Sequence, residues 1–103
     1  MKINDLTPEK KIELIENHLA VTRDALVEVF GLERTQAADY IDRFQDRYKD
    51  SSLEERVFVL HRDPVALAAD MTEMDLDDPN IADRLERFNK QREQVLEMAL
   101  QFT

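Results

Sequence analysis

The chain has 103 residues, and its 23 acidic against 14 basic residues give a formal net charge of −9. It contains no cysteine, which excludes disulfides and thiolate metal sites. One glycine and three prolines predict a mostly helical protein with a single modest core. No apolar run approaches the ~20 residues of a membrane span and no signal peptide is visible, so we expect a cytoplasmic protein.

The three prolines predict helix starts, because each follows a residue that can cap a helix. Thr7-Pro8, Asp63-Pro64 and Asp78-Pro79 all place a capping oxygen before a proline, which needs no backbone N–H at the first helical position. Combined with apolar spacing, they predict helices near 8–20, 23–30, 34–48, 64–73 and 79–101.

Residues 22–48 read as two helices joined by a tight turn. Thr22 is a candidate N-cap of the first, and Gly31, the single glycine, suits a left-handed residue after its end. The second helix has an apolar stripe that begins at Ala37 and continues through Ile41, Phe44 and Tyr48. This pattern fits a helix-turn-helix, and it equally fits any αα-hairpin with a glycine corner.

The segment after the second helix holds the best strand candidate. Residues 56–60 form a β-branched and aromatic run, and residues 49–53 offer a short partner. A hairpin here would be the wing of a winged helix-turn-helix. The alternatives are a single buried extended segment and the start of another helix.

Metal chemistry and catalysis are not expected. Asp75, Asp77 and Asp78 lack the glycine and the final glutamate of a calcium loop, so we interpret them as a solvated acidic linker. His18 and His61 have no neighbouring ligands. There is no glycine-rich phosphate loop, cysteine nucleophile or metal-ligand spacing, so we predict neither an enzyme nor a cofactor.

The last helix carries a long apolar stripe that can pack on the body or pair with a second copy. We favour a homodimer through this helix, in which Arg92 meets an acid of the partner chain. The predicted dimerisation residues are Ile81, Leu85, Phe88, Arg92, Val95, Ala99 and Phe102.

Residues 9–60 resemble the N-terminal winged helix-turn-helix domain of bacterial transcription regulators that carry a WYL domain. The matching segments are Lys11-Ile12-Glu13-Leu14-Ile15-Glu16, Thr22-Arg23-Asp24-Ala25-Leu26, Phe30-Gly31-Leu32, Gln36-Ala37 and Ile41-Asp42-Arg43-Phe44-Gln45. The resemblance implies a mainly α fold of three helices plus a small β-wing, which we assign to residues 1–62. From their charge and apolar spacing, residues 63–103 are expected to be an acidic linker and C-terminal helices that form a dimerisation element. The resemblance also implies DNA contacts by Arg34, Thr35, Gln36 and Arg43.

Two functions remain open at this point, and the residue-level match to the regulators favours the first. The first is a small dimeric regulator that binds double-stranded DNA, with Arg47, Lys49 and Arg56 near phosphates. Against it, Asp39, Asp42 and Asp46 form a stripe opposite the predicted core, where a recognition helix meets the major groove. The second is an acidic protein-interaction module, or an inhibitor, that occupies a basic, nucleic-acid-binding partner.

Overall fold

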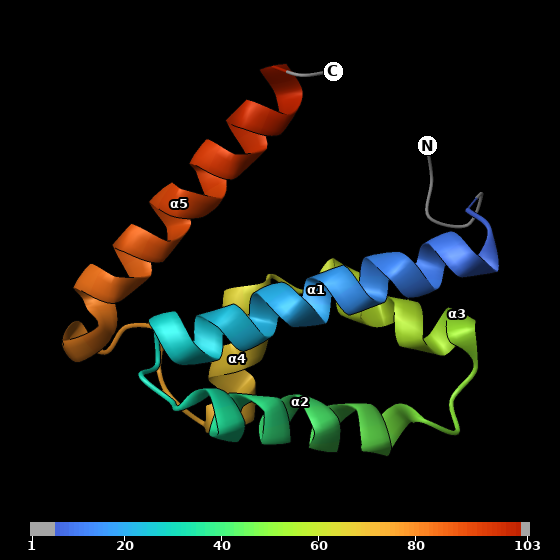
Figure 1. Ribbon diagram of the computed structural model, residues 1–103. Helices are drawn as coiled ribbons and strands as arrows, with labels where there is room; N and C mark the ends of the chain where they lie inside the picture. The colour runs from blue at the N-terminus through green and yellow to red at the C-terminus, as the bar shows by residue number, and fades with distance from the viewer. Residues whose placement is uncertain (1–5, 102–103) are drawn as a thin grey trace.

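The computed structural model describes the backbone of residues 6–101 and the side chains of residues 6–93, and every regular element in that range is helical. The elements in chain order are α1 (Pro8–Glu28), α2 (Arg34–Tyr48), α3 (Leu53–Arg56), the 3₁₀ helix η2 (Val57–His61), α4 (Pro64–Thr72), the 3₁₀ helix η3 (Pro79–Ile81) and α5 (Ala82–Gln101). Helix α1 is central, because α2, α3, η2, α4 and α5 all contact it (Figure 1).

Helix α1 is a single helix where the sequence predicted two. Its start is as predicted: Pro8 is at the first position, and the Thr7 hydroxyl accepts a hydrogen bond from the Lys10 backbone N–H at 3.2 Å. Thr22 does not cap a second helix. It is fully buried within α1, and its hydroxyl donates to the His18 carbonyl at 2.9 Å. No glycine or proline interrupts residues 9–28, so the helix continues and the threonine satisfies its hydroxyl one turn back.

The corner after α1 is formed by Gly31, as predicted. Gly31 has a φ of 74°, and its N–H donates to the Val27 carbonyl at 3.2 Å, which closes the helix end with a left-handed residue. A Cβ at this position would lie 2.7 Å from Nη1 of Arg84, so glycine also makes room for a side chain of α5. Helix α2 then has the predicted bounds, Arg34–Tyr48.

The predicted winged helix-turn-helix is wrong. Helices α1 and α2 run antiparallel as an αα-hairpin, the alternative that the sequence pattern left open (Figure 1). The predicted wing is absent, because the described residues contain no β-strand. Ser52 instead caps α3 by accepting from the Glu55 N–H at 3.2 Å, and residues 57–61 continue as η2.

The apolar run at residues 56–60 is helical because a strand needs a ladder partner for its backbone groups. A 3₁₀ turn satisfies those groups locally. It also places Val57 and Val59 in the protein interior, while Phe58 remains 40% exposed. High β-propensity in this run therefore reflects side chains suited to burial rather than an actual sheet.

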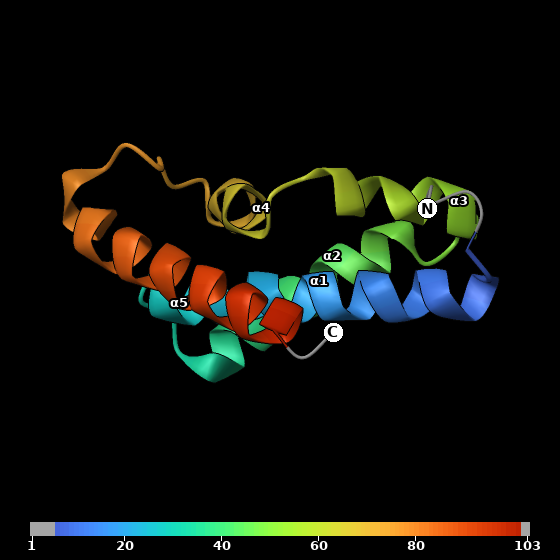
Figure 2. The same ribbon diagram turned by 90° about the horizontal axis from the view of Figure 1, so that it is seen from above.

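The other two proline-marked starts are confirmed. The Asp63 carboxylate accepts from the backbone N–H groups of Val65 and Ala66 at 3.0 and 3.2 Å, and α4 follows. Asp78 accepts from the Asn80 N–H at 2.9 Å, and η3 leads directly into α5. Elements α3, η2 and α4 follow one another along one side of α1 (Figure 2).

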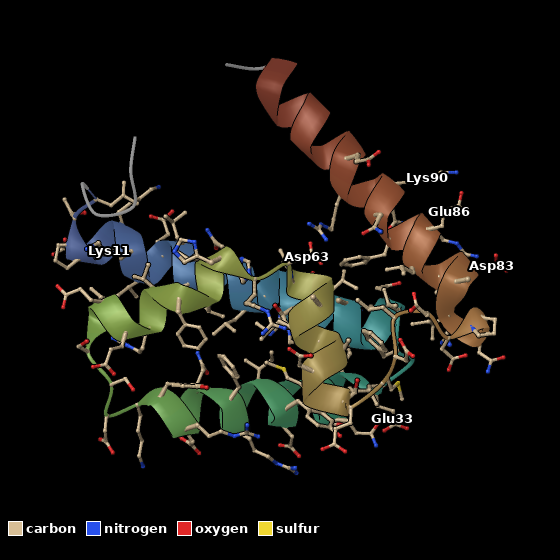
Figure 3. The ribbon with its side chains drawn as sticks, turned by 180° about the vertical axis from the view of Figure 1, so that it is seen from behind. Lys11, Glu33, Asp63, Asp83, Glu86 and Lys90 are labelled. Carbon is tan, nitrogen blue, oxygen red and sulfur yellow. The ribbon has the colours of Figure 1, made fainter. Side chains whose placement is uncertain are left out.

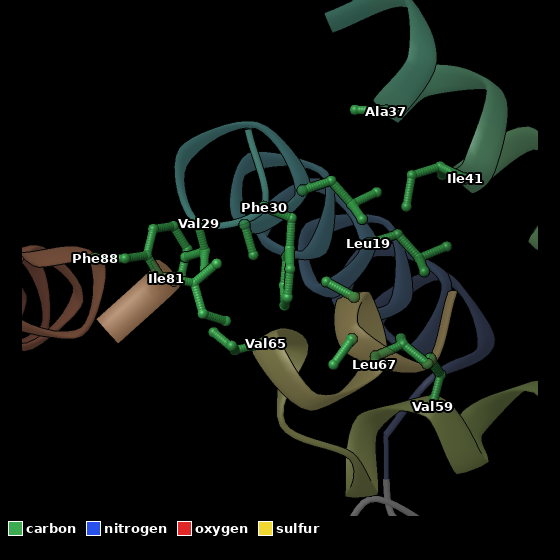
Figure 4. Close-up of a cluster of buried hydrophobic side chains, with 14 residues drawn as sticks. Leu19, Val29, Phe30, Ala37, Ile41, Val59, Val65, Leu67, Ile81 and Phe88 are labelled. Atoms are coloured by element: carbon green, nitrogen blue, oxygen red, sulfur yellow. The ribbon is translucent and has the colours of Figure 1, made fainter. Parts of the chain in front are cut away.

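One core joins residues before and after position 62. Leu26 and Val29 of the α1 end are fully buried, and they share a cluster with Val65 of α4 and Phe88 of α5 (Figure 4). Its buried members are Leu19, Ala25, Leu26, Val29, Phe30, Ala37, Ile41, Val59, Val65, Leu67, Ala68, Ala69, Ile81 and Phe88.

The first half of helix α5 packs on the body. Ile81 and Phe88 are buried and Leu85 is half-buried, so these three predicted dimerisation residues belong to the core of their own chain. The second half of the helix runs away from the other elements (Figure 1). No helix in residues 6–101 combines the length and apolar character of a bilayer span.

Arg92 forms an ion pair within its own chain. Its guanidinium pairs with the Asp63 carboxylate of the same chain at 3.3 Å and lies 5.8 Å from the centre of the Phe88 ring. It therefore has an acidic partner without a second copy. The side chains of Val95 and Ala99 are outside the described side chains, and Phe102 is outside the described residues.

Candidate functional site

The outward side of α2 carries three exposed carboxylates. Asp39, Asp42 and Asp46, which we call the aspartate face, are spaced three and four residues apart and lie opposite the buried Ala37 and Ile41. At 1.5 Å per residue the three Cα positions span about 10 Å of the helix axis. The surface is continuous because one straight helix presents all three.

No carboxylate of the aspartate face forms an ion pair with a described side chain, although α2 also carries three arginines. The ion pairs among residues 6–93 are Lys10–Glu13, Arg62–Asp70, Lys90–Glu86 and Arg92–Asp63, and none includes α2. Arg43 is one turn after Asp39, a spacing that allows an ion pair. Its guanidinium instead lies 5.7 Å from the centre of the Tyr40 ring.

On α5, in contrast to the aspartate face, an exposed acid and an exposed base form an ion pair. Glu86 and Lys90 pair with each other at 3.1 Å, and both point away from the body on the side that Asp83 also shares (Figure 3). Their charges are opposite and adjacent, so this surface has little net field. The aspartate face is therefore the better candidate for recognising a charged partner.

The seven predicted DNA contacts are not gathered on one surface. Arg34 lies beside Arg23 and Asp24 at the corner between α1 and α2, whereas Lys49 and Arg56 lie at the far end of α2. The fifteen-residue helix separates the two ends by about 22 Å. Gln36 is used locally, since its side-chain oxygen accepts from the Glu33 backbone N–H at 3.1 Å and caps α2. Thr35, Arg43 and Arg47 are exposed.

A pocket with aromatic walls lies between α1, the end of α2 and the α3–η2 segment. Its volume is about 230 Å³. We call it the aromatic pocket, and its lining residues are Ile15, Leu19, Phe44, Gln45, Asp46, Tyr48, Lys49, Arg56, Phe58 and Val59. The Tyr48 ring lies 5.0 Å from Phe44 and 5.2 Å from Phe58, between ring centres.

Sequence reasoning missed this pocket. It had assigned Arg56 to a phosphate contact on a wing and Phe44 and Tyr48 to the core. Both aromatic side chains are only half-buried, and Tyr48 packs against Phe58 from η2. An aromatic pair four residues apart on α2 was the available signal, but the third ring joins them only after the chain folds.

Neither histidine contributes to a metal site within the described residues, where no cluster of three metal-ligating side chains occurs. His18 is half-buried and its Nε2 has no hydrogen-bond partner. His61 is exposed.

No known protein family, curated protein or solved structure matches this chain. The resemblance of residues 9–60 to WYL-type regulators thus stays a prediction from a few short segments, and the site must be interpreted from its own chemistry.

Proposed function

We propose that the protein is a non-enzymatic interaction module that binds a basic protein surface through the aspartate face of α2. The observation that carries the proposal is the row of three exposed carboxylates that no basic side chain of residues 6–93 pairs with. A partner with matching lysine or arginine residues would replace water at these carboxylates.

The energetics of such a surface favour selectivity and fast association over raw affinity. An exposed ion pair contributes about 0.2–1 kcal/mol, so three such pairs cannot supply tight binding alone. The overall charge of −9 adds long-range attraction for a basic partner and repels acidic ones. The expected partner therefore combines a basic patch with apolar contacts.

DNA binding by a dimeric regulator is the second candidate. Arg34, Arg43, Arg47 and Lys49 are exposed on or just after α2, and each can reach a phosphate. The same helix, however, would present the aspartate face to a phosphate-lined groove, where like charges repel. Because of this repulsion, we prefer a basic protein partner to DNA.

For assembly, we propose that a second copy covers the second half of α5. This part of the helix extends beyond the body, and its sequence after Glu93 contains Val95, Leu96, Met98, Ala99 and Leu100. Sedimentation equilibrium on the full chain and on a chain ended after Glu93 tests this. We expect a dimer and a monomer respectively. Equal masses would contradict the proposed dimer.

Fluorescence anisotropy at about 50 mM salt separates the two candidate functions, because phosphate or carboxylate contacts dominate there. The probes are a labelled lysine-rich peptide and a labelled random-sequence duplex DNA. We expect saturable binding of the peptide, weakening as salt is raised, and no binding of the duplex. Duplex binding that is lost in R43Q/R47Q would support the regulator and overturn the interaction module.

A further inference from the structure

The aromatic pocket is lined by an arginine whose Nε has no hydrogen-bond partner. Arg56 is half-buried, and its Nε has no hydrogen-bond partner although the atom is buried. No ion pair among the described side chains includes it. Arg56 differs from the other unpaired bases because its Nε is buried, and a buried donor without a partner costs free energy.

The charge around Arg56 favours a single negative charge on a ligand. Lys49 lines the same pocket and adds a second cation, while Asp46 is the one carboxylate among the lining residues. Two cations and one anion leave a net charge of about +1 at the pocket. A monocarboxylate matches that balance, and a planar guanidinium can bind both of its oxygens.

The remaining walls favour a flat apolar body. Phe44, Tyr48 and Phe58 form a chain of neighbouring rings, and a ligand ring can pack against such rings in edge-to-face or offset geometry. Phe58 is 40% exposed, so its ring is available at the surface of the pocket. The volume of about 230 Å³ lies below the range of drug-sized ligand sites. The pocket therefore suits a ligand with one ring.

We propose that the aromatic pocket binds a small aromatic monocarboxylate, with the carboxylate on Arg56 and the ring against Tyr48 and Phe58. This site shares Asp46 with the aspartate face, but its existence does not depend on the proposed protein partner. No covalent step is involved.

The test is a titration of the full, ¹⁵N-labelled chain with benzoate, followed by NMR. The Arg56 Nε–H resonance reports on the guanidinium that would hold the carboxylate. We expect it to shift saturably, together with the backbone amides of Tyr48 and Phe58, with a Kd of about 1 mM or lower. Acetate, which lacks the ring, and benzyl alcohol, which lacks the charge, should each bind at least about tenfold more weakly.

Matched variants make the assignment specific. R56Q should abolish the saturable shift at Tyr48, whereas R87Q, the same change at an exposed position on α5, should leave it unchanged. F58A removes a ring that is 40% exposed and should weaken binding without unfolding the chain, so it tests the pocket even if R56Q fails to fold. Equal binding of benzoate and acetate, no saturation, or normal binding by F58A would overturn the proposal.

Discussion

The two faces of α2 have different roles: the inner face stabilises the fold, and the outer face is the proposed recognition surface. The inner face places Ala37 and Ile41 against α1 in the core, where apolar burial stabilises the fold. The outer face places three aspartates in solvent, where none contributes an ion pair within the described residues. Substitutions on the inner face should therefore change the free energy of unfolding, and substitutions on the outer face should change binding only.

The largest effect is expected from Ile41→Ala. Ile41 is 8% exposed, and truncating a buried isoleucine removes apolar contacts and leaves a partial cavity, which costs about 2–4 kcal/mol. Urea denaturation followed by circular dichroism measures this cost. The neighbouring Asp42→Ala is the control and should stay within about 0.5 kcal/mol of wild type. Similar costs for both would erase the distinction between the two faces.

A smaller effect is expected from Gly31→Ala, which disturbs the corner that decides which side of α2 faces outward. The φ of 74° costs a residue with a Cβ about 1–2 kcal/mol, and the new Cβ must also displace the Arg84 guanidinium. Making the same change in an Arg84→Ala background removes the contact and leaves the backbone cost. If the double variant recovers full stability, the positive φ is not the source of the effect.

The smallest changes in the free energy of unfolding are expected from substitutions of Thr7, which caps α1, and Thr22, which lies within it. Thr7→Val should cost about 1 kcal/mol, since Thr7 caps the helix. Thr22→Val should stay within about 0.5 kcal/mol, because its hydroxyl only supplements a helical carbonyl and a methyl group has the same size. Thermal and urea unfolding of the two variants provide the comparison. A larger loss of unfolding free energy in Thr22→Val than in Thr7→Val would indicate that Thr22 caps a second helix, against the continuous α1.

Features encoded by a few adjacent residues could be predicted from the sequence. The three cap-and-proline starts and the Gly31 corner depend on local hydrogen bonds and backbone angles, and the structure contains all of them. The bounds of α2 were also predicted, because its apolar spacing continues to Tyr48.

Features that depend on distant residues could not be predicted in the same way. The wing required a strand partner for residues 56–60, and whether one forms is decided by the whole fold. The dimer stripe on α5 was periodic, yet Ile81 and Phe88 pack on their own chain. The aromatic pocket combines α1, α2 and η2, so no local pattern marked Arg56 as its polar centre.

The most direct test of the central claim compares two triple variants with the same change in charge. D39N/D42N/D46N neutralises the aspartate face, and E73Q/D75N/D77N neutralises three exposed acids in the loop before η3. By anisotropy with the lysine-rich peptide, the first variant should bind at least about tenfold more weakly than wild type, and the second should be nearly unchanged. Equal weakening by both variants would show that net charge, and not the outer face of α2, governs binding.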